Sequence, residues 1–195
     1  MYQGLTFWSP NINIFRDPRW GRGHETYGED PYLTGQLGTQ FVKGLQGNDP
    51  NYLKTVATAK HYAVHSGPEP VRHEFNATVS ERDLRETYLP AFRSLVMDGE
   101  AYSVMGAYNQ FRGIPCCASP ELMNILRNEW GFKGYVVSDC WAISDFYMFQ
   151  KFSKNAEEAA AAAVIAGTDL NCGVAFSHLK DAYDQGLVTE DELDV

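Results

Sequence analysis

The sequence predicts an α/β fold of parallel strands, an incomplete (β/α)8 barrel of the TIM type. Strand-like and helix-like segments alternate along the chain, which is the pattern of parallel strands joined by helices. The later strands begin about 30–35 residues apart, as in such a barrel, whose usual length is about 250 residues. The chain has 195 residues and five expected strands. It therefore accounts for most of a barrel rather than for all of it.

Five short segments have the character of buried strands. Most of them are rich in β-branched or aromatic residues and are bounded by glycine or polar residues. They are Leu5–Trp8, Thr55–Tyr62, Tyr102–Tyr108, Gly134–Ser138 and Thr168–Cys172. A doubly wound sheet is the alternative architecture, but no glycine-rich phosphate-binding loop follows any of these strands.

Helices are expected between and after the strands. They are Asp30–Leu45, Ser80–Asp98, one that opens at Ser119, Asn155–Gly167, Phe176–Gln185 and one after Thr189. Local signals indicate their ends. Ser80 is followed by an acid three residues later, which is a capping box, and Pro120 occupies a first helical position. Gly99 is a typical helix stop.

The composition excludes several classes of partner. The chain carries 16 Lys and Arg residues against 25 Asp and Glu, a net charge of −9. Because no basic patch stands out, nucleic acid and anionic membranes are not expected partners. No apolar run is long enough to cross a membrane, and no signal peptide is visible at the start. The sequence gives no sign of an oligomeric state.

The four cysteines, at positions 116, 117, 140 and 172, lack the paired spacing of a zinc site. We therefore expect no metal and no cofactor. A disulfide that involves Cys117, Cys140 or Cys172 can form in an oxidising compartment. Which cysteines are joined cannot be read from the spacing.

The stretch from Gly134 to Cys140 is the centre of the functional interpretation. Its apolar run ends abruptly at Ser138-Asp139. Barrels and open α/β sheets collect their chemistry at the carboxyl ends of parallel strands, so Asp139 is a candidate active-site carboxylate. The alternative is that Asp139 caps a helix that begins near Trp141.

Residues that follow the other strands converge on the same mouth of a barrel. They are Asn11 to Arg22 after the first strand, Lys60 and His61 on the second, and Met105 and Tyr108 on the third. Cations and a histidine can hold vicinal hydroxyls of a sugar, and opposite charges favour the ionised carboxylate. Such a carboxylate can attack an anomeric carbon.

Each of these residues also has a purely structural alternative. Lys60-His61 can be a rim ion pair beside a buried histidine, and Met105 can be packing. Arg22 can pair with a nearby acid, and for Arg19 we favour such a pair with Glu25, Glu29 or Asp30. The remaining histidines have no metal-site spacing, and we expect His178 to be inert; they are His24, His65, His73 and His178.

Four motifs together resemble family 3 glycoside hydrolases over essentially the whole chain. The first runs from Ser9 to Arg22 and continues to Glu29-Asp30-Pro31. The others follow in the family's order and at its spacing, and they are Ala59–Tyr62, Val104–Asn109 and Val137–Asp139.

The resemblance implies a role for each site residue. Asp139 falls on the family's catalytic nucleophile. Arg22, Lys60 and His61 fall on residues that hold the hydroxyls of the sugar in the −1 subsite. Met105 and Tyr108 fall on positions that line the pocket. The implied reaction is retaining, with a partner acid about 5–5.5 Å from the nucleophile.

The resemblance also implies that the chain is an internal piece, residues 1–195 being part of the N-terminal barrel domain. In two-domain members an upstream Asp also holds the sugar, and a Glu from a second α/β domain is the general acid. We expect the opening strands, the last helix and that second domain to lie outside this chain. Full-length relatives of this type commonly act outside the cytoplasm, so a periplasmic or secreted parent protein is implied.

A few positions indicate which group of enzymes within the family the chain resembles most. β-N-acetylglucosaminidases use an Asp-x-His dyad, and here His73 takes the histidine position while Val71 stands where the Asp should be. The runs Ser138–Cys140 and Thr168–Gly173 instead look like β-xylosidases and related β-glucosidases. Cys140 replaces a Trp that is usual in many glucosidases, which favours a xylosidase.

Three hypotheses follow. The favoured one is a retaining, exo-acting β-glycosidase that releases terminal xylose or glucose. The second is a sugar-binding domain without turnover, because the partner acid is not expected within the chain; His73, Glu69 and Glu74 are the candidates if one exists. The third is a metal-dependent hydrolase that uses histidines, which chelators would inactivate.

Overall fold

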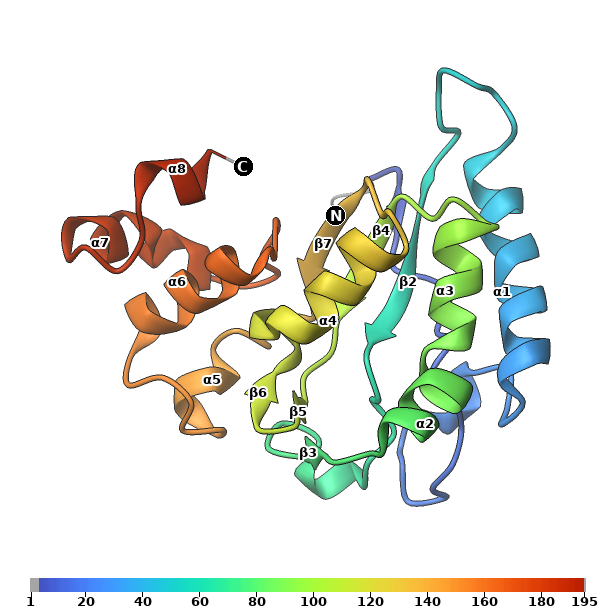
Figure 1. The fold of residues 1–195 in the computed structure, drawn as a ribbon, viewed down its shortest axis with the longest axis horizontal. Coiled ribbons are helices and arrows are strands. Elements are labelled where there is room, and N and C mark those ends of the chain that lie inside the picture. Colours follow the sequence, from blue (N-terminus) through green and yellow to red (C-terminus); the bar gives the residue numbers. More distant parts are fainter. Residues whose placement is uncertain (1–3, 195) are drawn as a thin grey trace.

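A computed structural model describes residues 4–194 as an α/β domain with a four-stranded parallel sheet (Figure 1). Its strands are β1 (Thr6–Phe7), β2 (Val56–Tyr62), β4 (Ser103–Gly106) and β7 (Tyr135–Ser138). The order in the sheet is β1-β2-β4-β7, so each strand lies beside the next one along the chain. A doubly wound sheet would reverse direction at a switch point. The order is that of a barrel wall, and the fold prediction is confirmed.

The two edge strands of the sheet approach one another. The Tyr135 hydroxyl on β7 lies 3.4 Å from Thr6 Oγ1 on β1. The sheet therefore curls as a barrel does, without closing within residues 4–194. The expected fifth strand, Thr168–Cys172, is reduced to one parallel bridge between Val137 and Leu170. One reason is that the Asp169 carboxylate, at 2.6 Å, accepts the Val136 N–H.

Helices lie along and beyond the sheet (Figure 1). They are α1 (Pro31–Gln46), α3 (Pro90–Met97), α4 (Pro120–Asn124), α6 (Ala156–Ala166), α7 (Leu179–Asp184) and α8 (Glu190–Leu193). The expected helix starts carry caps, since the side chains of Asp30, Ser80, Ser119 and Asn155 each accept a backbone N–H of the first turn. The capping box predicted at Ser80 is only half formed within residues 4–194, because the Asp83 carboxylate accepts the Ser80 hydroxyl rather than its N–H. Within residues 4–194, no helix combines the length and apolar character needed to span a bilayer.

The expected helix Ser80–Asp98 is not one regular α-helix. It consists of α2 (Glu81–Asp83), a π-helical turn over Leu84–Tyr88, and α3. The Leu89 N–H donates to the carbonyl of Leu84, five residues earlier, at 2.9 Å. Pro90 explains the change, because proline has no N–H and its ring clashes with the preceding helical turn.

A second sheet of three short strands was not predicted. It comprises β3 (Asn76–Ala77), β5 (Gln110–Phe111) and β6 (Ile114–Pro115). The hairpin between β5 and β6 turns at Arg112-Gly113, where both φ angles are positive. The expected strand Tyr102–Tyr108 ends earlier, at Gly106, and a short helix, α5 (Asp145–Met148), follows β7.

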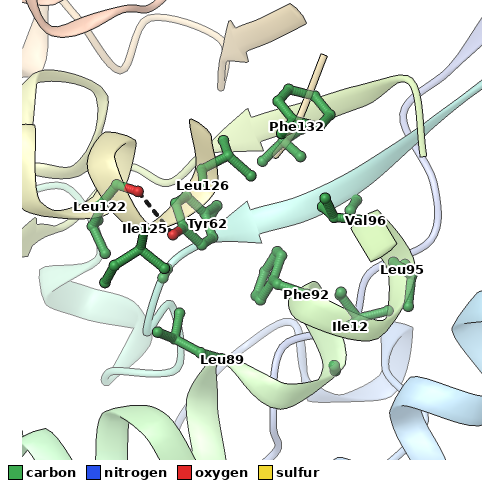
Figure 2. Close-up of a cluster of buried hydrophobic side chains, with 14 of the residues drawn as sticks. Ile12, Tyr62, Leu89, Phe92, Leu95, Val96, Leu122, Ile125, Leu126 and Phe132 are labelled. Carbon is green, nitrogen blue, oxygen red and sulfur yellow. Dashed lines mark hydrogen bonds between the residues drawn. The ribbon is translucent and has the colours of Figure 1, made fainter. Parts of the chain in front are cut away.

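The two faces of the parallel sheet have different environments. On one face Ala59, Val104 and Val136 are in register and belong to the main hydrophobic core. Figure 2 shows this core between the strands and helices, with the Tyr62 hydroxyl donating to the Leu122 carbonyl at 2.9 Å. Because side chains alternate along a strand, the register neighbours Lys60, Met105 and Val137 lie on the opposite, interior face.

Candidate active site

Asp139 lies immediately after β7 with its two carboxylate oxygens in different surroundings. Oδ1 accepts the Cys140 N–H at 2.8 Å. Oδ2 is buried and has no hydrogen-bond partner within residues 4–194. It lies 3.4 Å from His61 Nε2 and 3.8 Å from Arg22 Nη1. The residue is 7% exposed. The alternative that Asp139 is a helix cap is wrong, because α5 begins later and follows Ser144.

Arg22 is fixed on both sides. Its Nε and Nη2 donate to the two oxygens of Glu25, each at 2.7 Å. Its Nη1 donates to His61 Nε2 at 2.9 Å. The pairing with Glu25, expected as a structural alternative, thus holds the guanidinium beside Asp139. The expected pairing of Arg19 with a later acid is wrong, because Arg19 pairs at 2.6 Å with Asp17 in its own turn.

His61 is held as one neutral tautomer. Arginine cannot accept a hydrogen bond, so His61 Nε2 is the acceptor and Nδ1 carries the proton. Nδ1 lies 3.0 Å from Asn13 Oδ1. The same oxygen accepts the His61 N–H at 2.7 Å, and the Asn13 amide donates to the His61 carbonyl at 2.8 Å. Burial, reinforced by neighbouring His65 and Arg22, lowers the pKa of His61 well below its ordinary value.

Lys60 and Met105 are register neighbours on β2 and β4. Met105 is almost fully buried and lies outside the main core cluster. Burial lowers the pKa of Lys60, and the Arg22 charge acts in the same direction. Within residues 4–194, the Asp139 carboxylate lies within 4 Å of the Arg22 guanidinium and of the neutral His61 ring. The Lys60 ammonium is not within that distance.

Tyr108 lies where the chain has left β4. Its ring centroid is 4.6 Å from that of His73 and 6.0 Å from that of His65. The Arg72 guanidinium lies 5.4 Å from the Tyr108 ring centre. Burial raises the pKa of Tyr108, and the Asp139 charge acts in the same direction. The phenol therefore remains a hydroxyl that can donate a hydrogen bond.

Burial sets the direction of the Asp139 pKa, which lies above its ordinary value. The Cys140 N–H and the charges of Arg22 and Lys60 act against burial. From the sequence we expected the cations to favour the ionised form, and they do act in that direction, but burial outweighs them in the net shift. The arrangement supplies one carboxylate oxygen with no hydrogen bond of its own, facing a fixed guanidinium and a neutral imidazole.

The sequence reasoning assigned no role to several residues that order this site. Asn13 fixes His61, and Asn109 lies with its Oδ1 3.1 Å from His65 Nδ1. His65 is buried against His61, with ring centroids 4.9 Å apart, and burial lowers its pKa to about 3. Asn13 lies in the motif after the first strand, but an asparagine in a loop carries no signal for its partner.

A disulfide joins the residue after Asp139 to the next segment of the barrel wall. It links Cys140 and Cys172, whose Cα atoms are 4.4 Å apart. The Trp141 N–H donates to the Cys172 carbonyl at 2.7 Å. Cys116 and Cys117 remain as buried thiols. The connectivity left open by the sequence is therefore fixed, and it braces the turn that carries Asp139.

Groups that could hold a metal lie elsewhere. Glu157, His178 and Asp181 bring ligand atoms within 4.8 Å of one another near α6 and α7. His178 Nδ1 lies 3.6 Å from Glu157 in this partly exposed group. The His61 nitrogens already contact Asn13 and Arg22. We assign no role to the group around His178.

These features define a class, a (β/α) barrel domain with one buried carboxylate that faces a fixed guanidinium and a neutral imidazole at the carboxyl ends of its strands. The chain belongs to the family described as the glycosyl hydrolase family 3 N-terminal domain, which matches residues 4–195. It is 56% identical to a xylan 1,4-beta-xylosidase of Xylanibacter ruminicola, covering 98% of this chain and 23% of that protein. It is 47% identical to beta-D-xylosidase 3 of Arabidopsis thaliana, covering 98% and 26%.

Solved structures give the same result. A family 3 exo-beta-xylosidase in complex with a xylobiose aziridine probe has a TM-score of 0.93 at 37% identity, covering 98% of this chain and 26% of that one. A beta-glucosidase from Listeria innocua in complex with glucose has a TM-score of 0.87 at 33% identity, covering 97% and 27%. The chain thus spans about a quarter of the length of these relatives.

Proposed function

We propose that the protein carrying this chain is a retaining, exo-acting β-glycosidase. It releases β-D-xylosyl or β-D-glucosyl residues from the non-reducing ends of oligosaccharides. The observation that carries the proposal is Asp139 Oδ2, which is buried, lacks a hydrogen bond within residues 4–194, and faces Arg22 and His61. The named relatives, which are β-xylosidases and β-glucosidases, support the same class.

In the proposed reaction Asp139 Oδ2 attacks the anomeric carbon while the glycosidic oxygen leaves with a proton from an acid. A glycosyl ester forms on Asp139. Water, deprotonated by the conjugate base of that acid, then attacks the same carbon and frees the sugar with its original configuration. The acid belongs to a part of the protein outside residues 1–195, which we propose form part of the N-terminal barrel domain.

The proposed sugar contacts follow from the hydrogen-bonding capacity of each residue. Arg22 and Lys60 donate to hydroxyls, while Met105 and Tyr108 form the wall of the pocket. His61, kept neutral by burial, accepts the Arg22 Nη1–H through Nε2, so a sugar hydroxyl binds this nitrogen by replacing that contact. A contact that strengthens at the transition state contributes on the order of 10²–10³-fold in rate.

The xylosyl residue is the favoured sugar. The two relatives described above by sequence are xylosidases, at 56% and 47% identity. The test compares kcat/KM for 4-nitrophenyl β-D-xyloside, β-D-glucoside and β-D-N-acetylglucosaminide, with the anomer first released followed by NMR. We expect the xyloside to be hydrolysed fastest, with retention. Inversion would overturn the mechanism, and preference for the N-acetylglucosaminide would move the protein to that branch of the family.

A sugar-binding domain without turnover is the second candidate, and it applies to the isolated chain. It is favoured because, within residues 4–194, the side chains that lie within 4 Å of the Asp139 carboxylate in the ion-pair contacts are Arg22 and neutral His61, and neither is an acid suited to protonate a leaving group. The isolated chain is then expected to act at most on substrates with good leaving groups. Turnover of substrates with poor leaving groups by the isolated chain would show an acid within it.

A further inference from the structure

A second polar pair lies near the proposed sugar pocket. His73 Nδ1 lies 2.6 Å from Asp145 Oδ2, although the two residues are far apart in the chain. The Asp145 side chain is 3% exposed, whereas that of His73 is 38% exposed. A buried carboxylate is thus paired with an imidazole that is partly exposed to solvent. Burying a carboxylate is costly unless a partner compensates it, so Asp145 fixes the orientation of His73.

The far nitrogen of His73 is left for another partner. The Asp145 carboxylate accepts a hydrogen bond from Nδ1–H, and Nε2 lies at the opposite edge of the ring. Within residues 4–194 no hydrogen bond occupies Nε2. The ring of His73 is therefore held in place while its Nε2 remains available to hydrogen-bond a ligand.

The surroundings of His73 resemble the wall of a sugar subsite. Its ring lies edge-on to Tyr108 with centroids 4.6 Å apart, and 5.6 Å from the half-exposed ring of Phe149. Gln150 donates to the carbonyls of both His73 and Tyr108, at 3.1 and 2.6 Å. Gln150 therefore ties the His73 loop to the pocket residue Tyr108. Aromatic faces beside a polar nitrogen suit a sugar ring, which has apolar faces and hydroxyl edges.

His73 lies outside the first layer around Asp139. The direct neighbours of the carboxylate are His61 and Arg22, and within residues 4–194 no hydrogen bond or ion pair joins His73 to Asp139. The contact of His73 is with Tyr108, on the pocket wall, which favours contact with the next sugar unit rather than with the bond being broken.

We propose that His73, oriented by Asp145, forms a leaving-group subsite in which Nε2 hydrogen-bonds a hydroxyl of the sugar on the reducing side of the scissile bond. Tyr108 and Phe149 are its apolar wall. This subsite rests on the proposed glycosidase function. His73 is then a determinant of preference for oligosaccharides over simple glycosides.

Three substrates of the full-length protein test the subsite. β-1,4-Xylobiose has a sugar as leaving group, phenyl β-D-xyloside has a poor leaving group without sugar hydroxyls, and 2,4-dinitrophenyl β-D-xyloside has a good one. For His73→Ala we expect kcat/KM on xylobiose to fall about 10-fold, as for one lost hydrogen bond. Both aryl xylosides should stay within about twofold of wild type, because neither offers the hydroxyl.

Two further variants separate the subsite from a structural role. His73→Gln keeps a polar group near the Nε2 position and should recover part of the xylobiose activity. Asp145→Asn should lose xylobiose activity selectively, because His73 is no longer held by a carboxylate. His178→Ala, which changes a histidine on the outer helices, is the matched control and should behave as wild type.

Three results would overturn the proposal. Unchanged xylobiose activity in His73→Ala would show that the sugar does not touch His73. If kcat/KM of His73→Ala falls equally on xylobiose and phenyl xyloside but not on the dinitrophenyl xyloside, His73 acts as a proton donor. If it falls equally on all three substrates, the role of His73 is structural. A wild-type protein inactive on all three substrates would instead refute the glycosidase function itself, and the subsite with it.

Discussion

Asp139 is a carboxylate with competing influences on its charge. Burial raises its pKa, whereas the Cys140 N–H and the charges of Arg22 and Lys60 lower it. As the proposed nucleophile, Asp139 must be ionised, so we expect activity above this pKa and its loss as the pH falls through it. Because the net shift is upward, the acid limb of kcat/KM should lie above the ordinary range of an aspartate.

Lys60→Met tests this balance. Removing a nearby positive charge raises the pKa of Asp139 further, so the acid limb of kcat/KM should move to higher pH as the maximal rate falls. The measurement is the pH profile of kcat/KM on an aryl glycoside. Lys43→Met, on the exposed face of α1, is the matched control and should leave the limb in place. A limb that stays fixed or moves to lower pH in Lys60→Met would contradict this account.

Asn13→Ala tests the fixing of His61. The change removes three contacts that orient His61 and set its tautomer. We expect kcat/KM to fall on the order of 10–100-fold, because small displacements of positioning groups are costly. Assays should run well below the melting temperature, since the unpaired His61 N–H also destabilises the fold. Asn128→Ala, at an exposed site, is the control. Wild-type kinetics in Asn13→Ala would show that Asn13 is not needed to position His61 for the reaction.

The residues that face the mouth were predictable, but apart from Glu25, the expected partner of Arg22, the residues that hold them were not. Arg22, His61 and Asp139 each follow or end a strand, and barrel topology alone brings such positions together. Asp145 is different, because it meets His73 across 72 positions of the chain, and no local pattern encodes that contact. The upward shift of the Asp139 pKa depends on how deeply the side chain is buried, which residue types do not reveal.

At the scale of elements, the best predictions were those with a local cause. The caps at Asp30, Ser80 and Asn155 each rest on one side chain and one N–H. Gly134 was expected to bound the strand, and the structure gives the reason: a Cβ there would lie 2.0 Å from the Tyr102 carbonyl oxygen. The β5–β6 hairpin was missed because its Arg112-Gly113 turn lacks the usual Asn-Gly or Asp-Gly signature.

The disulfide at the end of β7 should contribute strongly to stability. Cys140 and Cys172 are 32 positions apart, and closing a loop of that length is worth about 3–4 kcal/mol. Cys140→Ser combined with Cys172→Ser should lower the free energy of unfolding by that amount in chemical denaturation. Reductant should reproduce the loss in wild type and have no effect on the double variant. Equal stability with and without the disulfide would refute the brace.

At the scale of the whole molecule, the curl of the sheet assembles the site. Strands in the order β1-β2-β4-β7 place Arg22, His61 and Asp139 at one end, although their positions span most of the chain. The chain covers about a quarter of the length of its relatives. We propose that this barrel wall supplies the nucleophile and sugar contacts, while another part of the protein supplies the acid.

The most direct test of the central claim is covalent trapping. A 2-deoxy-2-fluoro-β-xylosyl fluoride should inactivate the full-length protein with time, since fluorine slows hydrolysis of the glycosyl ester more than its formation. Proteolysis and mass spectrometry should then locate one fluoroxylosyl group on Asp139, and Asp139→Asn should remain unlabelled. A label on any other residue, or equal labelling of Asp139→Asn, would contradict the assignment of Asp139 as the nucleophile.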